Sequence, residues 1–166
     1  MIEVQVTETI NCPAGRVLEF VMDPRAYAAV DRKIGAIEWV RRAGDVTEFR
    51  FGSRLPGIPG PAAKVVSRMT RTPGERVDVR LPPIPANRLA NLVSEFSASW
   101  VCAASGERTA VTRTVRCGFK GPLKWFAEPV LRRTLRPDVE DEMRQAKAAL
   151  ESSGEMPPVI DSRGGG

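Results

Sequence analysis

The chain has 166 residues and a net charge of +5, with 42% apolar and 27% charged residues. That composition is typical of a soluble globular protein long enough to bury a sizeable core. The chain contains no histidine, which excludes Ser-His-Asp and Cys-His catalysis and most catalytic zinc and iron sites. Its three cysteines lack C-x-x-C spacing, so we expect free thiols, with no disulfide framework, metal or cofactor.

Charge and hydropathy also bear on location and partners. No stretch approaches the roughly 18 uninterrupted apolar residues of a membrane span, and the N-terminus lacks the basic-then-apolar order of a signal peptide. We therefore expect a cytoplasmic protein without an integral membrane segment. The basic residues are scattered rather than gathered into a block interleaved with aromatics, so nucleic acid is not an expected partner.

The first predicted elements are a strand and two short helices. Residues 2–10 alternate apolar and polar side chains, which predicts a half-buried strand. Pro13 then favours the start of a helix, because proline is preferred at the first helical position. Asp23 and Pro24 repeat this start signal, so a second short helix is expected to run to Val30, set at an angle to the first.

From Ile34 to Phe119 the sequence alternates as strands that are closed by turn chemistry. The predicted turns and links are Ala43–Asp45, Leu55–Pro61, Pro73-Gly74, Pro82–Leu89 and Ser105-Gly106. The wider link Pro82–Leu89 is expected to be irregular. Six consecutive strands, joined mainly by short turns, predict an antiparallel meander.

A long amphipathic helix is predicted over residues 120–150, although this segment carries three prolines. Its apolar stripe consists of Leu123, Ala127, Val130, Leu131, Leu135, Val139, Met143, Ala146 and Leu150. The opposite face changes from basic to acidic halfway, whereas a helix lying on a membrane surface is basic throughout. The stripe is therefore expected to cover the sheet. The prolines indicate either a kink that follows sheet curvature or a segment that shifts to admit a ligand.

The predicted domain spans residues 1–151. The remaining residues, 152–166, are rich in Gly, Pro and Ser and predict a flexible tail.

The order of these elements resembles the START-like or SRPBCC superfamily, which includes the polyketide cyclase/dehydrase and lipid-transport group. The resemblance is carried by VTETINCPAGRVLEFVMDPRAYAAVD (6–31), RTPGERVDVRLPP (71–83) and ERTAVTRTVRCGFKGPLKWFAEPVLRRTL (107–135). It implies an α+β helix-grip fold, in which a curved seven-stranded antiparallel sheet wraps a long C-terminal helix. Two short helices would lie between strands 1 and 2. The superfamily has no shared catalytic motif to transfer to this chain.

If this fold is correct, the inward side chains of the sheet and helix line a cavity between them. The expected ligand-binding residues are Trp39, Phe49, Phe51, Met69, Phe96, Trp100, Arg113, Val115, Phe126 and Val130. An apolar wall with few polar groups suits a small hydrophobic ligand. The alternative is that the same residues fill a solid core, as aromatics on strands commonly do.

The ionisable candidates for catalysis are few. They are Tyr27, Asp31, Glu48, Glu95 and Arg113. Glu95 and Arg113 lie on the last two strands and would be neighbours only if the registers agree. Parity favours Glu95 facing solvent and Arg113 facing inward, and no catalytic residue is assigned.

We therefore expect a carrier or sensor of a lipid, fatty acid, isoprenoid or polyketide, with Leu55–Pro61 and Pro82–Leu89 as gates. One alternative is a polyketide cyclase, aromatase or dehydratase that works without histidine or metal; another is a protein-interaction module with a filled core. The basic residues Arg41, Arg42, Arg132, Arg133 and Arg136 either guide an acidic headgroup or maintain solubility. A homodimer remains open.

Overall fold

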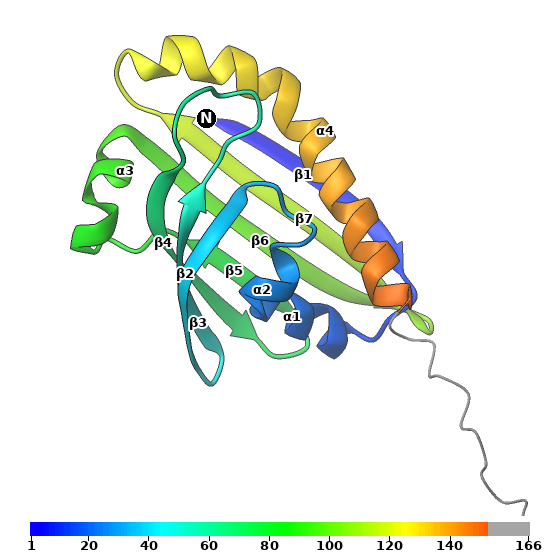
Figure 1. The fold of residues 1–166 in the computed structure, drawn as a ribbon. Helices are drawn as coiled ribbons and strands as arrows, with labels where there is room; N and C mark the ends of the chain where they lie inside the picture. The colour runs from blue at the N-terminus through cyan, green and yellow to red at the C-terminus, as the bar shows by residue number, and fades with distance from the viewer. Residues whose placement is uncertain (153–166) are drawn as a thin grey trace, which may run out of the picture.

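The computed structural model describes residues 1–152 and shows one curved antiparallel sheet around a long helix (Figure 1). The elements are β1 (Ile2–Ile10), α1 (Ala14–Met22), α2 (Pro24–Tyr27), β2 (Ile34–Ala43), β3 (Val46–Ser53), β4 (Ala63–Thr72), β5 (Arg76–Arg80), a 3₁₀ turn (Pro85–Asn87), α3 (Arg88–Val93), β6 (Ser94–Ser105), β7 (Arg108–Phe119) and α4 (Leu123–Ser152). The strand order is β1-β7-β6-β5-β4-β3-β2. The predicted helix-grip fold is thus confirmed, including the two short helices between β1 and β2.

The start of α2 follows from its sequence. The Asp23 carboxylate accepts hydrogen bonds from the backbone N–H groups of Arg25, at 3.1 Å, and Ala26, at 3.4 Å. Pro24 occupies the first turn, where no N–H donor is needed. The helix ends at Tyr27 rather than at Val30.

The link between β5 and β6 is not irregular as expected, because it contains a 3₁₀ turn and α3. Asn87, which is fully buried, holds it in place. The Asn87 side-chain amide donates to the carbonyls of Val66, at 2.7 Å, and Pro82, at 2.9 Å, and its oxygen accepts from Val66 N at 2.8 Å. One side chain thus attaches the link to β4.

Helix α4 is continuous through Pro129 and Pro137 and curves along the sheet (Figure 1). Both prolines are exposed, so the carbonyls that lose their helical donors face water, which accommodates a bend. Most of the predicted stripe is buried, but Leu123 is exposed. The buried stripe packs chiefly on β1 and β7, which positions α4 over one half of the sheet.

Within the described residues, no helix is long and apolar enough to cross a bilayer. The three cysteines are free thiols and lie buried in the core. The predicted flexible tail lies outside the described residues, apart from Ser152, which ends α4.

Candidate functional site

A cavity of about 560 Å³ lies inside the concave face of the sheet. Inner side chains of β3 to β7, residues 54–55 and 58–61 of the β3–β4 loop and the inner side of α3 form most of its wall. Most of these side chains are apolar, while Tyr27, Asp31, Lys33 and Arg113 contribute a polar region. Pro59, Gly60 and Pro61 border the cavity and are also exposed, which marks where it opens. Its size and lining are those of a small-molecule site.

Half of the sequence-predicted ligand-binding residues lie in this wall. They are Phe49, Phe51, Met69, Phe96 and Arg113. The rings of Phe49 and Phe51 stack at 4.8 Å between centroids. The other five do not line the cavity, for three different structural reasons.

Trp39 lies on the outer face of the sheet because of a β-bulge. The register between β2 and β3 shifts between Ile37 and Trp39, so that Ile37 opposes Phe51 while Trp39 opposes Arg50. Directly opposed residues share a face of the sheet, and Arg50 points away from the inner pair Phe49 and Phe51. The Arg41 guanidinium stacks over the Trp39 ring at 4.6 Å. The simple alternation used for the prediction fails at this bulge.

Trp100 and Val115 point inward but are fully buried in the core without reaching the cavity. Phe126 is 77% exposed and Val130 is half-buried. No described residue of α4 belongs to the cavity wall. The expected cavity between sheet and helix is therefore wrong in position: buried α4 side chains fill the space against β1 and β7. The cavity occupies the other half of the concave face, under the β3–β4 loop.

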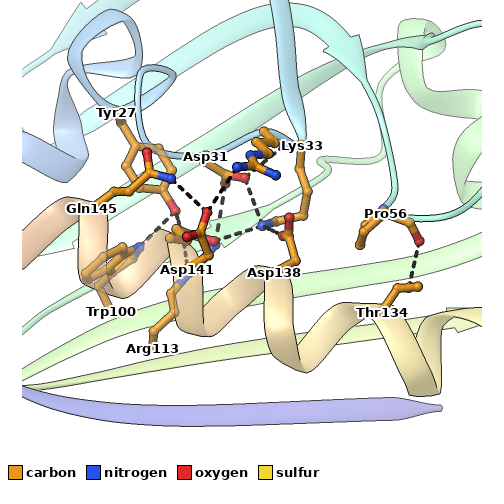
Figure 2. Close-up of polar contacts among 12 residues, drawn as sticks. Tyr27, Asp31, Lys33, Pro56, Trp100, Arg113, Thr134, Asp138, Asp141 and Gln145 are labelled. Carbon is orange, nitrogen blue, oxygen red and sulfur yellow. Dashed lines mark hydrogen bonds and ion pairs between the residues drawn. The ribbon is translucent and has the colours of Figure 1, made fainter.

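A buried cluster of charged groups connects the cavity to α4 (Figure 2). Its centre is the Lys33 ammonium, only 7% of whose side chain is exposed. Lys33 Nζ lies 2.8 Å from Asp31 Oδ1, 2.7 Å from Asp138 Oδ2 and 2.8 Å from Glu142 Oε2. Three converging carboxylates resemble a metal site, but here the lysine ammonium occupies the point where they meet.

Glu142 joins this cluster to β7 and α2. Its Oε1 accepts a hydrogen bond from Arg113 Nε at 3.0 Å and another from the Tyr27 hydroxyl. Trp100 Nε1 donates to the same hydroxyl at 3.3 Å. The Arg113 guanidinium lies 5.4 Å from the Trp100 ring centroid, and its Nη1 has no hydrogen-bond partner among the described residues. Besides Glu142, the cation therefore contacts the indole face, the Tyr27 ring and Asp31.

Within the cluster, neighbouring opposite charges favour the charged forms of Lys33 and Glu142. Burial disfavours a charged Lys33, but Glu142 and Asp31 outweigh that effect and raise its pKa above the ordinary value. Burial likewise acts to raise the pKa of Glu142, whereas the Arg113 and Lys33 cations hold it below the ordinary value. For Asp31, burial together with the Glu142 charge raises the pKa. Asp31, the carboxyl that lines the cavity, thus takes up a proton more readily than an ordinary aspartate.

The sequence identified part of this cluster. Tyr27, Asp31 and Arg113 border the cavity, while Glu48 and Glu95 lie outside it and pair with Arg68 and Lys120. The strand register places Glu95 opposite Gly118 and Arg113 opposite Trp100, so the Glu95–Arg113 pairing does not form. Glu95 faces solvent and Arg113 faces inward, as parity predicted.

Sequence reasoning missed Lys33, Asp138 and Glu142. Glu142 had a detectable signal, because it follows Val139 by three residues and precedes Ala146 by four, which places it on the buried face of α4. Lys33 had none, because a lysine in a turn is ordinarily exposed.

The β3–β4 loop is attached to α4 at the edge of the cavity. Thr134 Oγ1 donates to the Pro56 carbonyl at 2.7 Å (Figure 2). Gly57 has a φ of +79°, and a Cβ there would lie 2.9 Å from side-chain atoms of Val130 and Thr134. Glycine thus permits both the turn and the close approach of the loop to the helix.

Three solved structures have a fold similar to that of this chain. A protein designated TTHA0849 from Thermus thermophilus is 17% identical, with a TM-score of 0.72 over 93% of this chain and 100% of its own. The Zhui aromatase/cyclase from Streptomyces sp. R1128 is 18% identical, with a TM-score of 0.67 over 93% and 99%. A START superfamily protein from Mycobacterium smegmatis is 13% identical, with a TM-score of 0.62 over 91% and 98%.

At these identities the solved structures show a shared fold and nothing finer. No curated protein matches the chain. The family described as polyketide cyclase / dehydrase and lipid transport matches residues 1–151, which is nearly all of the described chain. The protein therefore belongs to the polyketide cyclase / dehydrase and lipid transport family.

Proposed function

We propose that the protein binds a small hydrophobic molecule in the cavity and acts as its carrier or sensor. The observation that carries this proposal is a cavity of about 560 Å³ with a mostly apolar wall and a polar region around Tyr27, Asp31, Lys33 and Arg113. A filled-core interaction module would not have such a space. Among the expected ligand classes, a lipid with an uncharged oxygen, an isoprenoid and a polyketide suit it best.

The polar region favours one orientation of the ligand. The apolar part of a molecule gains by contact with Phe49, Phe51 and Phe96, while an oxygen is best placed toward Asp31 and Arg113. Asp31, when protonated, donates a hydrogen bond, whereas its ionised form accepts one. Because the cluster already holds three carboxylates against two cations, a neutral carbonyl or hydroxyl oxygen suits it better than a further carboxylate.

The experiment is a titration with an environment-sensitive fatty probe, alongside native mass spectrometry of freshly purified protein. Val79→Phe, in the cavity wall, is expected to weaken saturable probe binding at least about tenfold by filling space that the ligand needs. The matched control is Val101→Phe, because Val101 alternates with the buried Trp100 and Cys102 and lies outside the wall. Absence of saturable binding in the wild type, or equal binding by both variants, would refute the proposal.

A cyclase or dehydratase is the second candidate. The observation in its favour is that the ionisable side chains Tyr27, Asp31, Lys33 and Arg113 share one region of the cavity wall. A protonated Asp31 beside the Arg113 cation is suited to polarise a ketone by hydrogen bonding, whereas its ionised form is suited to accept a proton from the carbon next to the ketone. Turnover of a poly-β-ketone chain that is lost in Asp31→Asn, with probe binding retained, would favour the enzyme over the carrier.

A further inference from the structure

We propose that the end of the molecule formed by α3 and the first turn of α4 docks on a membrane surface that is rich in anionic lipid. We call this surface the tip, and it consists of Leu89, Leu92, Leu123, Trp125 and Phe126. Apart from Met1, these are the exposed large apolar side chains of the described residues, with Trp125 81% exposed and Leu89 74% exposed. Their concentration on two short segments is the observation to be explained.

The two segments form one end of the molecule. The Lys120 backbone N–H donates to the Val93 carbonyl at 2.9 Å, and Lys120 Nζ donates to the Asn91 carbonyl at 3.3 Å. These bonds attach the end of α3 to the residues that lead into α4. Figure 1 shows both elements at the end of the sheet opposite to the last turn of α4. The tip is therefore a feature of the fold rather than of two unrelated loops.

The chemistry of the tip suits a lipid interface. Trp and Phe side chains that protrude together with leucines gain by insertion at the boundary between headgroups and acyl chains. Neighbouring in sequence are Arg88, Lys124 and Arg133, all exposed, and none has an ion-pair partner among residues 1–152. Unpaired cations around protruding apolar side chains complement an anionic membrane surface.

The charge distribution along α4 gives this docking a direction. The half that contains the tip, residues 123–137, carries four basic residues and one acidic residue, whereas residues 138–152 carry five acidic and two basic residues. Asp138 and Glu142 are paired inside the protein, so the other charges of the second half are three acidic and two basic residues. The helix is therefore attracted to an anionic surface chiefly through its first half. It can approach with its first turn foremost, which is the arrangement that the exposed Trp125 and Phe126 require.

The tip adjoins the wall of the cavity. On α3, Ala90 and Val93 line the cavity, while Leu89 and Leu92 are exposed. Phe119, at the end of β7, also belongs to the wall and is four residues from Leu123. Docking through the tip would therefore bring this end of the cavity near the bilayer and shorten the path of an apolar molecule through water. The docking itself does not depend on which ligand the cavity holds.

A second copy of the chain fits the tip less well. In a two-fold symmetric dimer each surface meets its own copy, so that Arg88, Lys124 and Arg133 of both subunits would gather at one interface. Like charges brought together without partners oppose such an association.

The test is co-sedimentation with vesicles of phosphatidylcholine, with and without phosphatidylglycerol, at low and high salt. Wild-type protein is expected to bind the anionic vesicles, to bind pure phosphatidylcholine weakly and to dissociate as salt increases. Trp125→Ser combined with Leu92→Ser is expected to lower partitioning at least about tenfold by removing the inserted side chains. Arg88→Glu combined with Lys124→Glu is expected to lower it by a similar factor or more, through lost attraction and added repulsion.

The matched control is Arg144→Glu, an exposed charge reversal in the acidic half of α4, which should leave partitioning unchanged. Thermal unfolding of each variant shows whether it is folded, and probe binding without vesicles separates a docking defect from a cavity defect. Absence of binding to anionic vesicles by the wild type, or equal binding by tip variants and control, would overturn the proposal. So would a wild-type dimer that the tip variants convert to monomers, because the tip would then be a self-association surface.

Discussion

Glu142 of α4 and Arg113 of β7 form a buried ion pair with 3.0 Å between Arg113 Nε and Glu142 Oε1. The pair connects the long helix to the sheet at the place where the cavity begins, and Lys33 extends it to the turn before β2. Removing one partner from a buried cluster of this kind destabilises the fold, because the remaining charges stay buried without an opposite charge. It therefore provides sharp tests of how the helix and the cavity wall are held together.

Glu142→Gln is expected to lower the free energy of unfolding by on the order of 3 kcal/mol, because Lys33 and Arg113 lose their shared counter-ion in a buried site. The measurement is urea unfolding at neutral pH. Glu140→Gln is the control, since Glu140 forms an exposed pair with Arg136, and it should change little. Equal stability of the two variants would show that the buried pair does not hold α4.

The depressed pKa of Glu142 also predicts that the protein loses stability in acid. The Arg113 and Lys33 cations outweigh burial and hold the pKa of Glu142 below its ordinary value of 4.5. A carboxyl whose pKa is depressed by folding contributes stability above its unfolded pKa and loses it as the pH falls through the folded value. Stability should thus fall below about pH 4.5 in the wild type and fall less steeply in Glu142→Gln.

The wild type must be compared with a variant that lacks Glu142, because Asp31 changes the stability in the opposite direction as the pH falls. Its pKa is raised by burial and by the Glu142 charge, so acid favours its buried form. Unfolding curves at several pH values, compared between Asp31→Asn and Asp31→Asn combined with Glu142→Gln, isolate Glu142. Parallel curves would contradict the prediction.

Asn87→Ala is expected to lower the free energy of unfolding by at least about 2 kcal/mol, because it leaves the buried N–H and carbonyl groups of Val66 without the Asn87 side chain as partner. Hydrogen exchange should accelerate at the Val66 amide, which donates to the Asn87 side chain. The control is Asn91→Ala, since Asn91 makes a single long bond of 3.4 Å to the Pro82 carbonyl. If Val66 exchanges equally in both variants, Asn87 does not anchor the link.

Gly57→Ala is expected to loosen the β3–β4 loop over the cavity. The added Cβ meets Val130 and Thr134 side-chain atoms at 2.9 Å, so the loop must move away from α4. Bound probe should then dissociate faster, as measured by stopped-flow displacement. Gly44→Ala is the control: its φ of +58° brings comparable backbone strain, but nothing lies within 4 Å of its Cβ. Equal dissociation rates would show that this loop is not a gate.

Several parts of the fold could be predicted because they depend on local chemistry. The alternation along β6 and β7 placed Arg113 on the inner face, and the Asp23-Pro24 start signal located α2. The cavity was a harder case. Phe49, Phe51, Met69 and Phe96 were found by parity alone, but parity failed at Trp39, where the bulge in β2 reverses the face of each following side chain.

By itself, the sequence determined the order of elements, the antiparallel meander and the apolar stripe of α4, because hydrophobic periodicity and turn residues act over a few neighbours. Only the tertiary structure decided that α4 covers β1 and β7, so that the cavity opens beside the helix rather than beneath it. Likewise, only folding brought Lys33 to Glu142, which lies 109 residues away. Pairing at such separations depends on how elements pack in space, and no local pattern records it.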